Sequence, residues 1–304
     1  MDGRPTTAPS AEVAGWVRGV AATHDPRVTS STPVFPLLTP ALPTRPLIRE
    51  HSEVYVCAGV MVKIHSAHTD PGRLARRLFC LGGTDMDRLW IQPLAYAPFP
   101  APDGRLGSLW PRVTVLSTID AAPWERAGSL LARLHCGEVA EGAPASGAAS
   151  RLGRAVDWLA ANRPDLDVAA IGAELRHALA EKPATGWVHG DFHLGQLGHT
   201  PLRSSWKLLD ADALGLGDPA WDLGRVAGFR AAGLIDEAAW QTFLGAYTEA
   251  GGPGAGAGDP WDAVRDPARA ALLIVAVRQL QAGRDADAAV LLEGVRRLGE
   301  ATPS

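Results

Sequence analysis

The sequence has few cysteines, no long hydrophobic run and no strong charge of one sign. Its three cysteines are widely spaced and odd in number, which fits neither a disulfide framework nor a zinc site and favours a reducing cytoplasm. The longest aliphatic run, "AALLIVAV", is too short to span a bilayer, and the opening "MDGRPTTAPS" lacks the apolar segment of a secretory signal. A net charge of −4 gives no reason to propose nucleic acid or an anionic membrane as a partner. We therefore expect a cytoplasmic protein, whose oligomeric state the sequence does not determine.

Lysine is also scarce. The chain has 29 basic residues, but only Lys63, Lys182 and Lys207 are lysine. GC-rich coding explains such a bias. A lysine retained in this background can also occupy a position where a compact ammonium group cannot be replaced by a planar guanidinium.

The first part of the chain is rich in strand signals. After an N-terminal segment, 1–29, with a helical pattern at 11–22, residues 30–117 combine a proline-rich extended stretch with several predicted strands. "EVYVCAGVMVKIH" predicts a hairpin that turns at Ala58-Gly59, and "LWIQPLAY" and "GSLWPRVTVL" predict two more strands. Between them, Asp70 at the N-cap and Pro71 at the first position predict a helix.

Residues 118–304 are mostly helical in pattern. A linker, "EGAPASGAAS", and a flexible loop, "GGPGAGAGDP", separate predicted helices at 122–138, 151–162, 167–182, 218–233, 236–250 and 260–283. The predicted fold class is α+β, with a small strand-rich lobe at 30–117 and a larger helical lobe at 118–304.

The stretch "HGDFHLGQ", 189–196, interrupts these helices and carries the chemistry. Asp191 and Gln196 follow a short strand, and the turn "GHTPLRSS" leads into a second strand that ends at Asp210, so a hairpin would return Asp210 to the neighbourhood of Gln196. Phosphoryl transfer uses a carboxylate to accept the hydroxyl proton, and an amide oxygen with a second carboxylate to hold Mg²⁺. This predicts Asp191 as the base and Gln196 with Asp210 as metal ligands. Asp212 either assists the metal or is simply solvated.

Two plainer interpretations compete with this one. His189 and His193 have a spacing that suggests zinc, but a third ligand at a sensible spacing is missing. A satisfied polar turn explains any one of these residues, but it is a poor explanation for all the carboxylate and amide groups together.

The motif, followed by "LLDADALGLGDPAWDLGR", resembles the catalytic signature of the aminoglycoside phosphotransferase superfamily, small-molecule kinases with a protein-kinase-like bilobal fold. The segment "HLGQ", 193–196, resembles the catalytic loop of maltokinase-like sugar kinases. The resemblance is strong over 187–228 and weaker from about 50 to 135. It implies that the segment containing Asp218 and Asp222 braces the catalytic loop, and that His189 orders it.

The same resemblance implies residues that bind ATP. Lys63 stands where the family's phosphate-binding lysine belongs, Ser52 is a candidate for the ATP phosphates, and Val113 lies where main-chain groups contact adenine. Gln196 departs from the family's usual asparagine, and the predicted helix at 71–80 lacks a glutamate to pair with Lys63. Another acid, such as Asp70, Glu53 or Asp210, would then have to orient the lysine.

The predicted function is an ATP- and Mg²⁺-dependent transfer of the γ-phosphate to a hydroxyl of a small molecule, either an aminoglycoside-like antibiotic or a sugar or amino sugar. The alternative is a catalytically inactive nucleotide-binding module that works as an interaction protein. Helical acids in the second half of the chain offer a weak attraction for a cationic acceptor: Asp236, Glu237, Glu249, Asp262 and Asp266.

Overall fold

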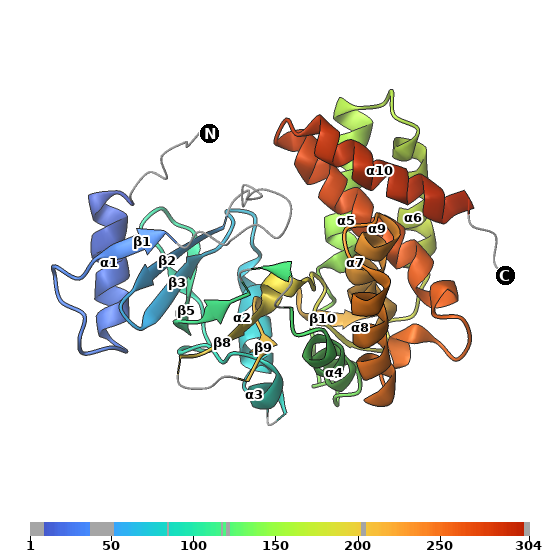
Figure 1. The fold of residues 1–304 in the computed structure, drawn as a ribbon. Helices are drawn as coiled ribbons and strands as arrows, with labels where there is room; N and C mark the ends of the chain where they lie inside the picture. The colour runs from blue at the N-terminus through green and yellow to red at the C-terminus, as the bar shows by residue number, and fades with distance from the viewer. Residues whose placement is uncertain are drawn as a thin grey trace. The chain divides into compact units, whose positions relative to one another are not determined.

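The computed structural model describes residues 9–36, 52–83, 85–116, 118–119, 122–201 and 205–300. Its contacts divide into two compact units (Figure 1). Of the described residues, those up to 36, from 52 to 115 and from 198 to 209 belong to unit 1, and those from 116 to 197 and from 210 onward belong to unit 2. The predicted α+β class with a kinase-like arrangement is confirmed by strand-rich and helical units of this kind.

Unit 1 is built on an antiparallel sheet. In the described part of the chain, its strands follow the order β1-β2-β3-β5-β4. Their bounds are Val34–Pro36, Glu53–Cys57, Val60–Ile64, Leu106–Pro111 and Phe99–Pro100 for β1, β2, β3, β5 and β4. The predicted hairpin is confirmed: Ala58 adopts a left-handed conformation (φ 52°) between β2 and β3, and Asp25 accepts a hydrogen bond from Gly59 N at 3.2 Å.

Helix α1 (Ala11–Ala22) belongs to this unit, because Val17 and Ala21 are fully buried in the same core as Val62 and Ile64. Helix α2 (Pro71–Cys80) confirms the predicted start, since the Asp70 carboxylate accepts a hydrogen bond from Arg73 N at 2.7 Å. The remaining elements of the unit are α3 (Met86–Leu89), β6 (Thr114–Val115), β8 (Leu197–His199) and β9 (Lys207–Leu208).

Two features of this unit differ from the sequence prediction. "LWIQPLAY" is not a strand: α3 ends within it, and Trp90 forms only an isolated bridge with Leu208. Leu89, Trp90 and Ile91 are buried without a continuous ladder of strand hydrogen bonds, and a short apolar run of this kind cannot be distinguished from a strand by periodicity. Most of the proline-rich stretch, from residue 37 onward, lies outside the described residues.

Unit 2 is mainly helical, with a short antiparallel pair formed by β7 (Gly186–Val188) and β10 (Gly215–Gly217). Its helices are α4 (Trp124–His135), α5 (Ala148–Asn162), α6 (Val168–Ala180), α7 (Ala220–Ala231), α8 (Glu237–Glu249), α9 (Pro260–Gln281) and α10 (Asp285–Glu300). Short 3-10 turns complete it at η2 (Leu194–Gln196), η3 (Ala211–Ala213) and η4 (Pro253–Ala255). Every one of these long helices except α10 is predicted by the sequence.

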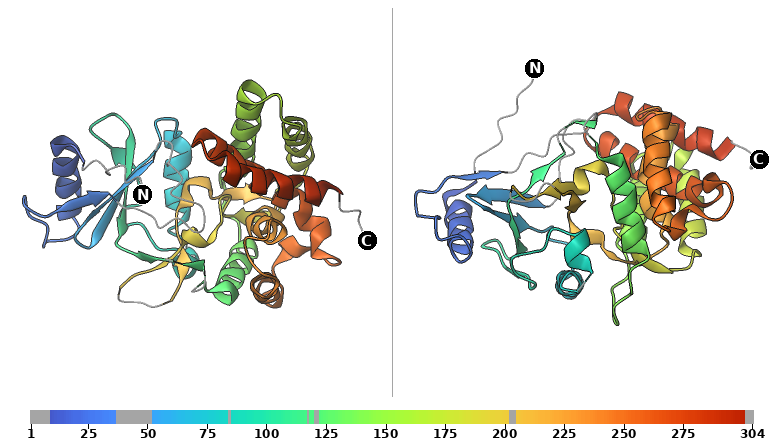
Figure 2. Two further views of the ribbon diagram at one scale, coloured as in Figure 1. Left: turned by 45° about the horizontal axis from the view of Figure 1, so that its top comes forward. Right: turned by 60° about the horizontal axis from the view of Figure 1, so that its bottom comes forward.

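Helix α9 is the centre of unit 2, and α5, α6, α7 and α10 all pack on it (Figure 2). Helices α7 and α9 approach closely because α7 carries glycines at the contact. A Cβ on Gly224 would lie 2.6 Å from the Pro267 carbonyl, and one on Gly228 would lie 2.9 Å from Ala268 O. The side chains that α7 and α9 project beside this contact are therefore held on closely packed backbones.

The stretches predicted as a linker and as a flexible loop both make defined main-chain contacts. Ser146 N donates to Leu216 O at 2.9 Å and Gly147 N donates to Ala213 O at 3.0 Å, so the segment before α5 pairs with the β10 region. In the glycine-rich stretch after α8, η4 is buried at Gly254 and Ala255. Small residues at both places allow two backbones to approach closely. Because flexible loops are also rich in small residues, composition alone does not distinguish the two cases.

The domain boundaries expected from the sequence differ from the two units in two respects. Residues 11–22 pack into unit 1 rather than forming a separate segment, and the β8-β9 region at 198–209 also belongs to unit 1. Among the described residues, no helix has both the length and the apolarity needed to cross a membrane.

Candidate active site

The catalytic motif leaves the buried strand β7 as a tight loop. Gly190 has φ 78°, and a Cβ at this position would lie 2.5 Å from Ala213 O and 2.6 Å from Ser146 Oγ. No residue with a side chain fits at this position. The loop therefore turns sharply after His189 and presents Asp191 as the next residue.

Asp222, at the start of α7, fixes this turn. Its carboxylate accepts hydrogen bonds from His189 N at 2.5 Å and Gly190 N at 2.8 Å, and it is 1% exposed. Trp221 Nε1 donates to Gly190 O at 3.3 Å. The implied bracing role of this segment is confirmed for Asp222, whereas the Asp218 carboxylate accepts a hydrogen bond from Ala220 N, at the start of α7, at 3.0 Å.

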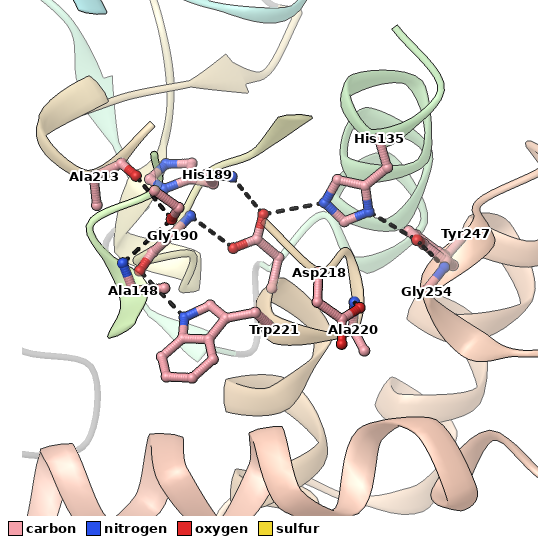
Figure 3. Close-up of polar contacts among 12 residues, drawn as sticks. His135, Ala148, His189, Gly190, Ala213, Asp218, Ala220, Trp221, Tyr247 and Gly254 are labelled. Atoms are coloured by element: carbon pink, nitrogen blue, oxygen red, sulfur yellow. Dashed lines mark hydrogen bonds and ion pairs between the residues drawn. The ribbon is translucent and has the colours of Figure 1, made fainter. Parts of the chain in front are cut away.

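A chain of side chains behind Asp222 reaches α4 and α8 (Figure 3). The Tyr247 hydroxyl accepts from Gly254 N at 2.8 Å, so its own proton is available for His135 Nδ1 at 2.7 Å. His135 Nδ1 is then an acceptor, and Nε2, which lies 3.1 Å from the Asp222 carboxylate, carries the proton and donates it to that carboxylate. Each member is buried and has a partner, so the loop's anchor is itself rigidly held.

Asp191 is surrounded by positive charge. One of its carboxylate oxygens lies 2.7 Å from Arg151 Nη2 and 2.9 Å from Arg225 Nη2, and its side chain is 15% exposed. Burial alone would raise the pKa of Asp191. The guanidinium groups of Arg151, Arg225 and Arg278 outweigh burial and hold that pKa well below its usual range. Asp191 is thus a carboxylate at every physiological pH.

The rest of the motif forms a short 3-10 turn. Burial and the Arg225 charge lower the pKa of His193 well below its usual value, so the ring is neutral. Its Nδ1 accepts a hydrogen bond from Gly195 N at 3.1 Å, and His193 O accepts from Gln196 N at 2.7 Å. His189 is fully buried and packs edge-on against Phe192.

The predicted metal ligands lie on either side of the β8-β9 pair. Those strands are hydrogen-bonded neighbours, which confirms the predicted hairpin between Gln196 and Asp210. Asp210 has φ 61°, an uncommon conformation for a non-glycine residue, and its carboxylate accepts from Asp212 N at 3.3 Å. Strained backbone of this kind concentrates at functional sites.

The donor set of these residues suits Mg²⁺, which prefers hard oxygen ligands and needs few from the protein. Gln196 supplies an amide oxygen, and Asp210 with Asp212 supplies carboxylates. In the described part of the chain, no group of three or more His, Cys, Asp or Glu side chains is arranged to hold a metal ion. A closed cage of the structural-zinc type is therefore absent from those residues.

The candidate nucleotide residues lie in unit 1. Lys63 is buried in β3, opposite Val54 on β2 and Ser108 on β5. Ser52 is half-buried directly before β2, and Val113 lies in the short connection between β5 and β6.

Two of the acids expected to orient Lys63 have other partners. Asp70 caps α2. Glu53 accepts hydrogen bonds from the Tyr55 hydroxyl and from Arg105 Nη2, the latter at 2.9 Å.

Three of the acids expected to attract a cationic acceptor have other partners. Asp236 caps α8 by accepting from Ala239 N at 2.7 Å, Glu237 pairs with Arg230, and Asp266 lies 3.4 Å from Arg269. The charge that surrounds Asp191 is instead positive.

Sequence reasoning missed the arginines around Asp191 and the His135–Tyr247 pair. A weak signal existed for Arg225, which follows Asp222 by three residues and so shares its helix face. Arg151, Arg278 and Tyr247 come from distant helices, and no spacing in the sequence relates them to the motif.

Comparison with known proteins supplies a family and a fold. Residues 92–272, more than half of the chain, match the model of a family described as "Phosphotransferase enzyme family". No curated protein sequence matches the chain significantly.

Three similar solved structures are all distant in sequence. A choline/ethanolamine kinase family protein from Mesorhizobium loti has a TM-score of 0.60 at 18% identity, over 94% of both chains. The GDP and kanamycin complex of APH(2″)-IIia has a TM-score of 0.60 at 13% identity, covering 94% of this chain and 97% of that one. A thermostable mutant of aminoglycoside phosphotransferase APH(4)-Ia, in ternary complex with AMP-PNP and hygromycin B, has a TM-score of 0.58 at 15% identity, over 94% and 99%. At these identities the likeness establishes the fold alone.

Proposed function

Because the chain belongs to the phosphotransferase enzyme family, we propose that it transfers the γ-phosphate of ATP to a hydroxyl group of a small molecule, with Asp191 as the base. The observation that carries this proposal is the Asp191 carboxylate. It follows a loop pinned by Asp222, and the neighbouring guanidinium groups keep it ionised.

In the proposed reaction, Asp191 orients the acceptor hydroxyl and receives its proton. The acceptor oxygen bonds to the γ-phosphorus as the bond from that phosphorus to the β–γ bridging oxygen breaks, and ADP leaves. A carboxylate with a lowered pKa is a weak base, but a loose transition state needs positioning more than strong proton abstraction. His189 would order the loop rather than exchange protons, since its ring is buried against Phe192.

Gln196 and Asp210 would hold Mg²⁺, with Asp212 next to it. The metal would neutralise phosphate charge. Lys63 would contact the ATP phosphates, Ser52 would help through its hydroxyl and main-chain N–H, and main-chain groups around Val113 would contact adenine. The buried position of Lys63 supports this role, because lysine is rarely buried unless its charge has a partner.

The sequence is compatible with two classes of acceptor, an aminoglycoside-like antibiotic and a sugar or amino sugar. Release of ADP from Mg²⁺-ATP should be measured with purified protein against a panel of both, beside Asp191→Asn. We expect acceptor-dependent turnover that the variant loses by roughly two to four orders of magnitude. ATP binding without turnover on any acceptor would instead support the inactive nucleotide-binding module.

A further inference from the structure

Four arginines from three helices of unit 2 act on Asp191. Arg151 and Arg154 come from α5, Arg225 from α7 and Arg278 from α9, and each contributes a favourable electrostatic interaction with the Asp191 carboxylate. We call these four side chains the arginine cluster. Figure 1 shows their three helices beside one another, and α5 and α7 both pack on α9.

The cluster carries more positive charge than its protein neighbours neutralise. Among the described residues, Asp191 is the only carboxylate that forms an ion pair with a member of the cluster. Asp222 also attracts Arg225, but it already accepts from two main-chain N–H groups and faces His135. Four guanidinium groups therefore lie near two carboxylates, one of which is already engaged. His193 adds none, because its ring is neutral.

Part of the cluster's donor capacity is unused. Arg225 is only 8% exposed, and among the described residues no acceptor reaches its Nε. In the same part of the chain, neither Arg154 nor Arg278 forms an ion pair. A guanidinium offers five N–H donors, so the cluster has free donors beside the predicted reaction centre.

Placing these charges together is costly. Burial, followed by the charge of Arg151, lowers the pKa of Arg278 to about 9, and burial also lowers the pKa of Arg225, whereas Arg154 is an exposed residue of α5. A bound anion would relieve this repulsion and replace the lost hydration, and guanidinium groups suit carboxylates and phosphates because they bind both in a bidentate manner.

We infer that the acceptor is an anion: a hydroxylated small molecule with a carboxylate or phosphate group that the arginine cluster binds while its hydroxyl faces Asp191. This inference rests on the proposed function and narrows its substrate class. Arg154 and Arg278 would hold the acceptor's anionic group, since Arg151 and Arg225 already pair with Asp191. A polycationic acceptor such as an aminoglycoside would be repelled at this position.

Acceptors that share one ring but differ in charge test the inference. Mg²⁺-ATP turnover should be measured with glucose, glucosamine, glucuronate and glucose 6-phosphate at constant ionic strength. We expect kcat/KM for at least one anionic sugar to exceed that for glucose by roughly tenfold or more, and glucosamine to be the poorest. A preference for glucosamine over both anions overturns the inference and leaves the proposed phosphotransfer intact.

Substitutions then separate the acceptor from the other anion in the reaction, the γ-phosphate. Arg154→Gln and Arg278→Gln should each raise the KM for the anionic acceptor by roughly tenfold, while the KM for ATP stays within about twofold of wild type. Because Arg278 also acts on the Asp191 carboxylate, the two acceptors are compared within each variant, and the preference for the anion over glucose should fall by roughly tenfold. Arg230→Gln is the control, because Arg230 lies on α7 and pairs with Glu237 at the surface. If the KM for ATP rises and that for the acceptor does not, the cluster serves the γ-phosphate and the inference is wrong.

A binding measurement decides the matter if no sugar of the set is phosphorylated. Glucuronate should then raise the melting temperature more than glucose does, and the Arg154→Gln/Arg278→Gln double variant should lose that difference. Equal stabilisation by the two sugars, or an effect that survives in the double variant, overturns the inference. Failure of the proposed function would appear separately, as no ADP release with any hydroxyl compound of the wider acceptor panel.

Discussion

Replacing Asp191 with asparagine should affect stability as well as catalysis. The substitution keeps the shape of the side chain but removes the negative charge that pairs with Arg151 at 2.7 Å and Arg225 at 2.9 Å. Arg225, 8% exposed, would then lie among Arg151 and Arg278 without its main counter-ion. Asparagine can still accept a hydrogen bond, so the structure loses charge compensation rather than every contact.

The magnitude follows from how buried the pairs are. Removing one partner of a fully buried ion pair costs about 3–5 kcal/mol. Because the Asp191 side chain is 15% exposed, and the amide oxygen keeps one acceptor, we expect a loss of about 2–4 kcal/mol in the free energy of unfolding. The kcat should fall by roughly two to four orders of magnitude, because an amide cannot accept the hydroxyl proton.

Urea unfolding and steady-state kinetics measure the two effects separately. Asp157→Asn is the matched control: Asp157 lies 2.8 Å from Arg176, but its side chain is 72% exposed, so its loss should cost less than about 1 kcal/mol. Unfolding free energies within about 0.5 kcal/mol for Asp191→Asn and wild type would refute the role of the arginine pairs. An unchanged kcat would refute Asp191 as the base.

Four further predictions concern the groups around this site. Tyr247→Phe removes the hydroxyl that joins Gly254 N to His135, and should lower the free energy of unfolding by about 1–3 kcal/mol in urea; a change below about 0.5 kcal/mol would show that this hydrogen-bonded chain is dispensable. Lys63→Arg should reduce kcat/KM for ATP by one to a few orders of magnitude, and an unaffected enzyme would exclude a phosphate-binding lysine. Asp210→Asn should abolish most Mg²⁺-dependent turnover, so wild-type activity at limiting Mg²⁺ would remove Asp210 from the metal site. Folding lowers the pKa of Asp191 below its unfolded value of about 3.9, so the ionised carboxylate stabilises the fold above about pH 5, and this contribution is lost as the pH falls through the folded value. Between pH 5 and 3, the free energy of unfolding should therefore fall more for wild type than for Asp191→Asn. Parallel losses in the two proteins would contradict this linkage.

Local signals in the sequence predicted the elements that local chemistry determines. Asp70 and Pro71 determine where α2 begins, and the alternating apolar residues on either side of Ala58-Gly59 determine the hairpin. The motif residues were predicted for the same reason, since Asp191, Gln196 and Asp210 lie within one strand–loop–hairpin segment.

What the sequence did not predict depends on contacts between distant segments. The arginine cluster is assembled by the packing of α5 and α7 on α9, and a single sequence does not encode which helical arginines face one another. The acids that the sequence suggested for binding a cationic acceptor include Asp236, which instead caps α8. The stretch "EGAPASGAAS" was wrongly predicted to be a linker because its hydrogen bonds with Leu216 are made by main-chain groups. Small side chains leave such groups accessible, but they do not show which partner the groups will bind.

The hydrogen-bonded chain from Tyr247 through His135 to Asp222 has a consequence for how the protein is made on the ribosome. The motif at 189–196 emerges before Asp222, and well before the residues at 247–254 that complete its support. A nascent chain that ends just after Asp212 would contain every residue proposed for catalysis and metal binding, yet its catalytic loop would lack an anchor. Since domains generally fold as units during synthesis, the active conformation should appear only when α8 has left the exit tunnel. A truncated product of stalled translation would accordingly be inert rather than a partly active kinase.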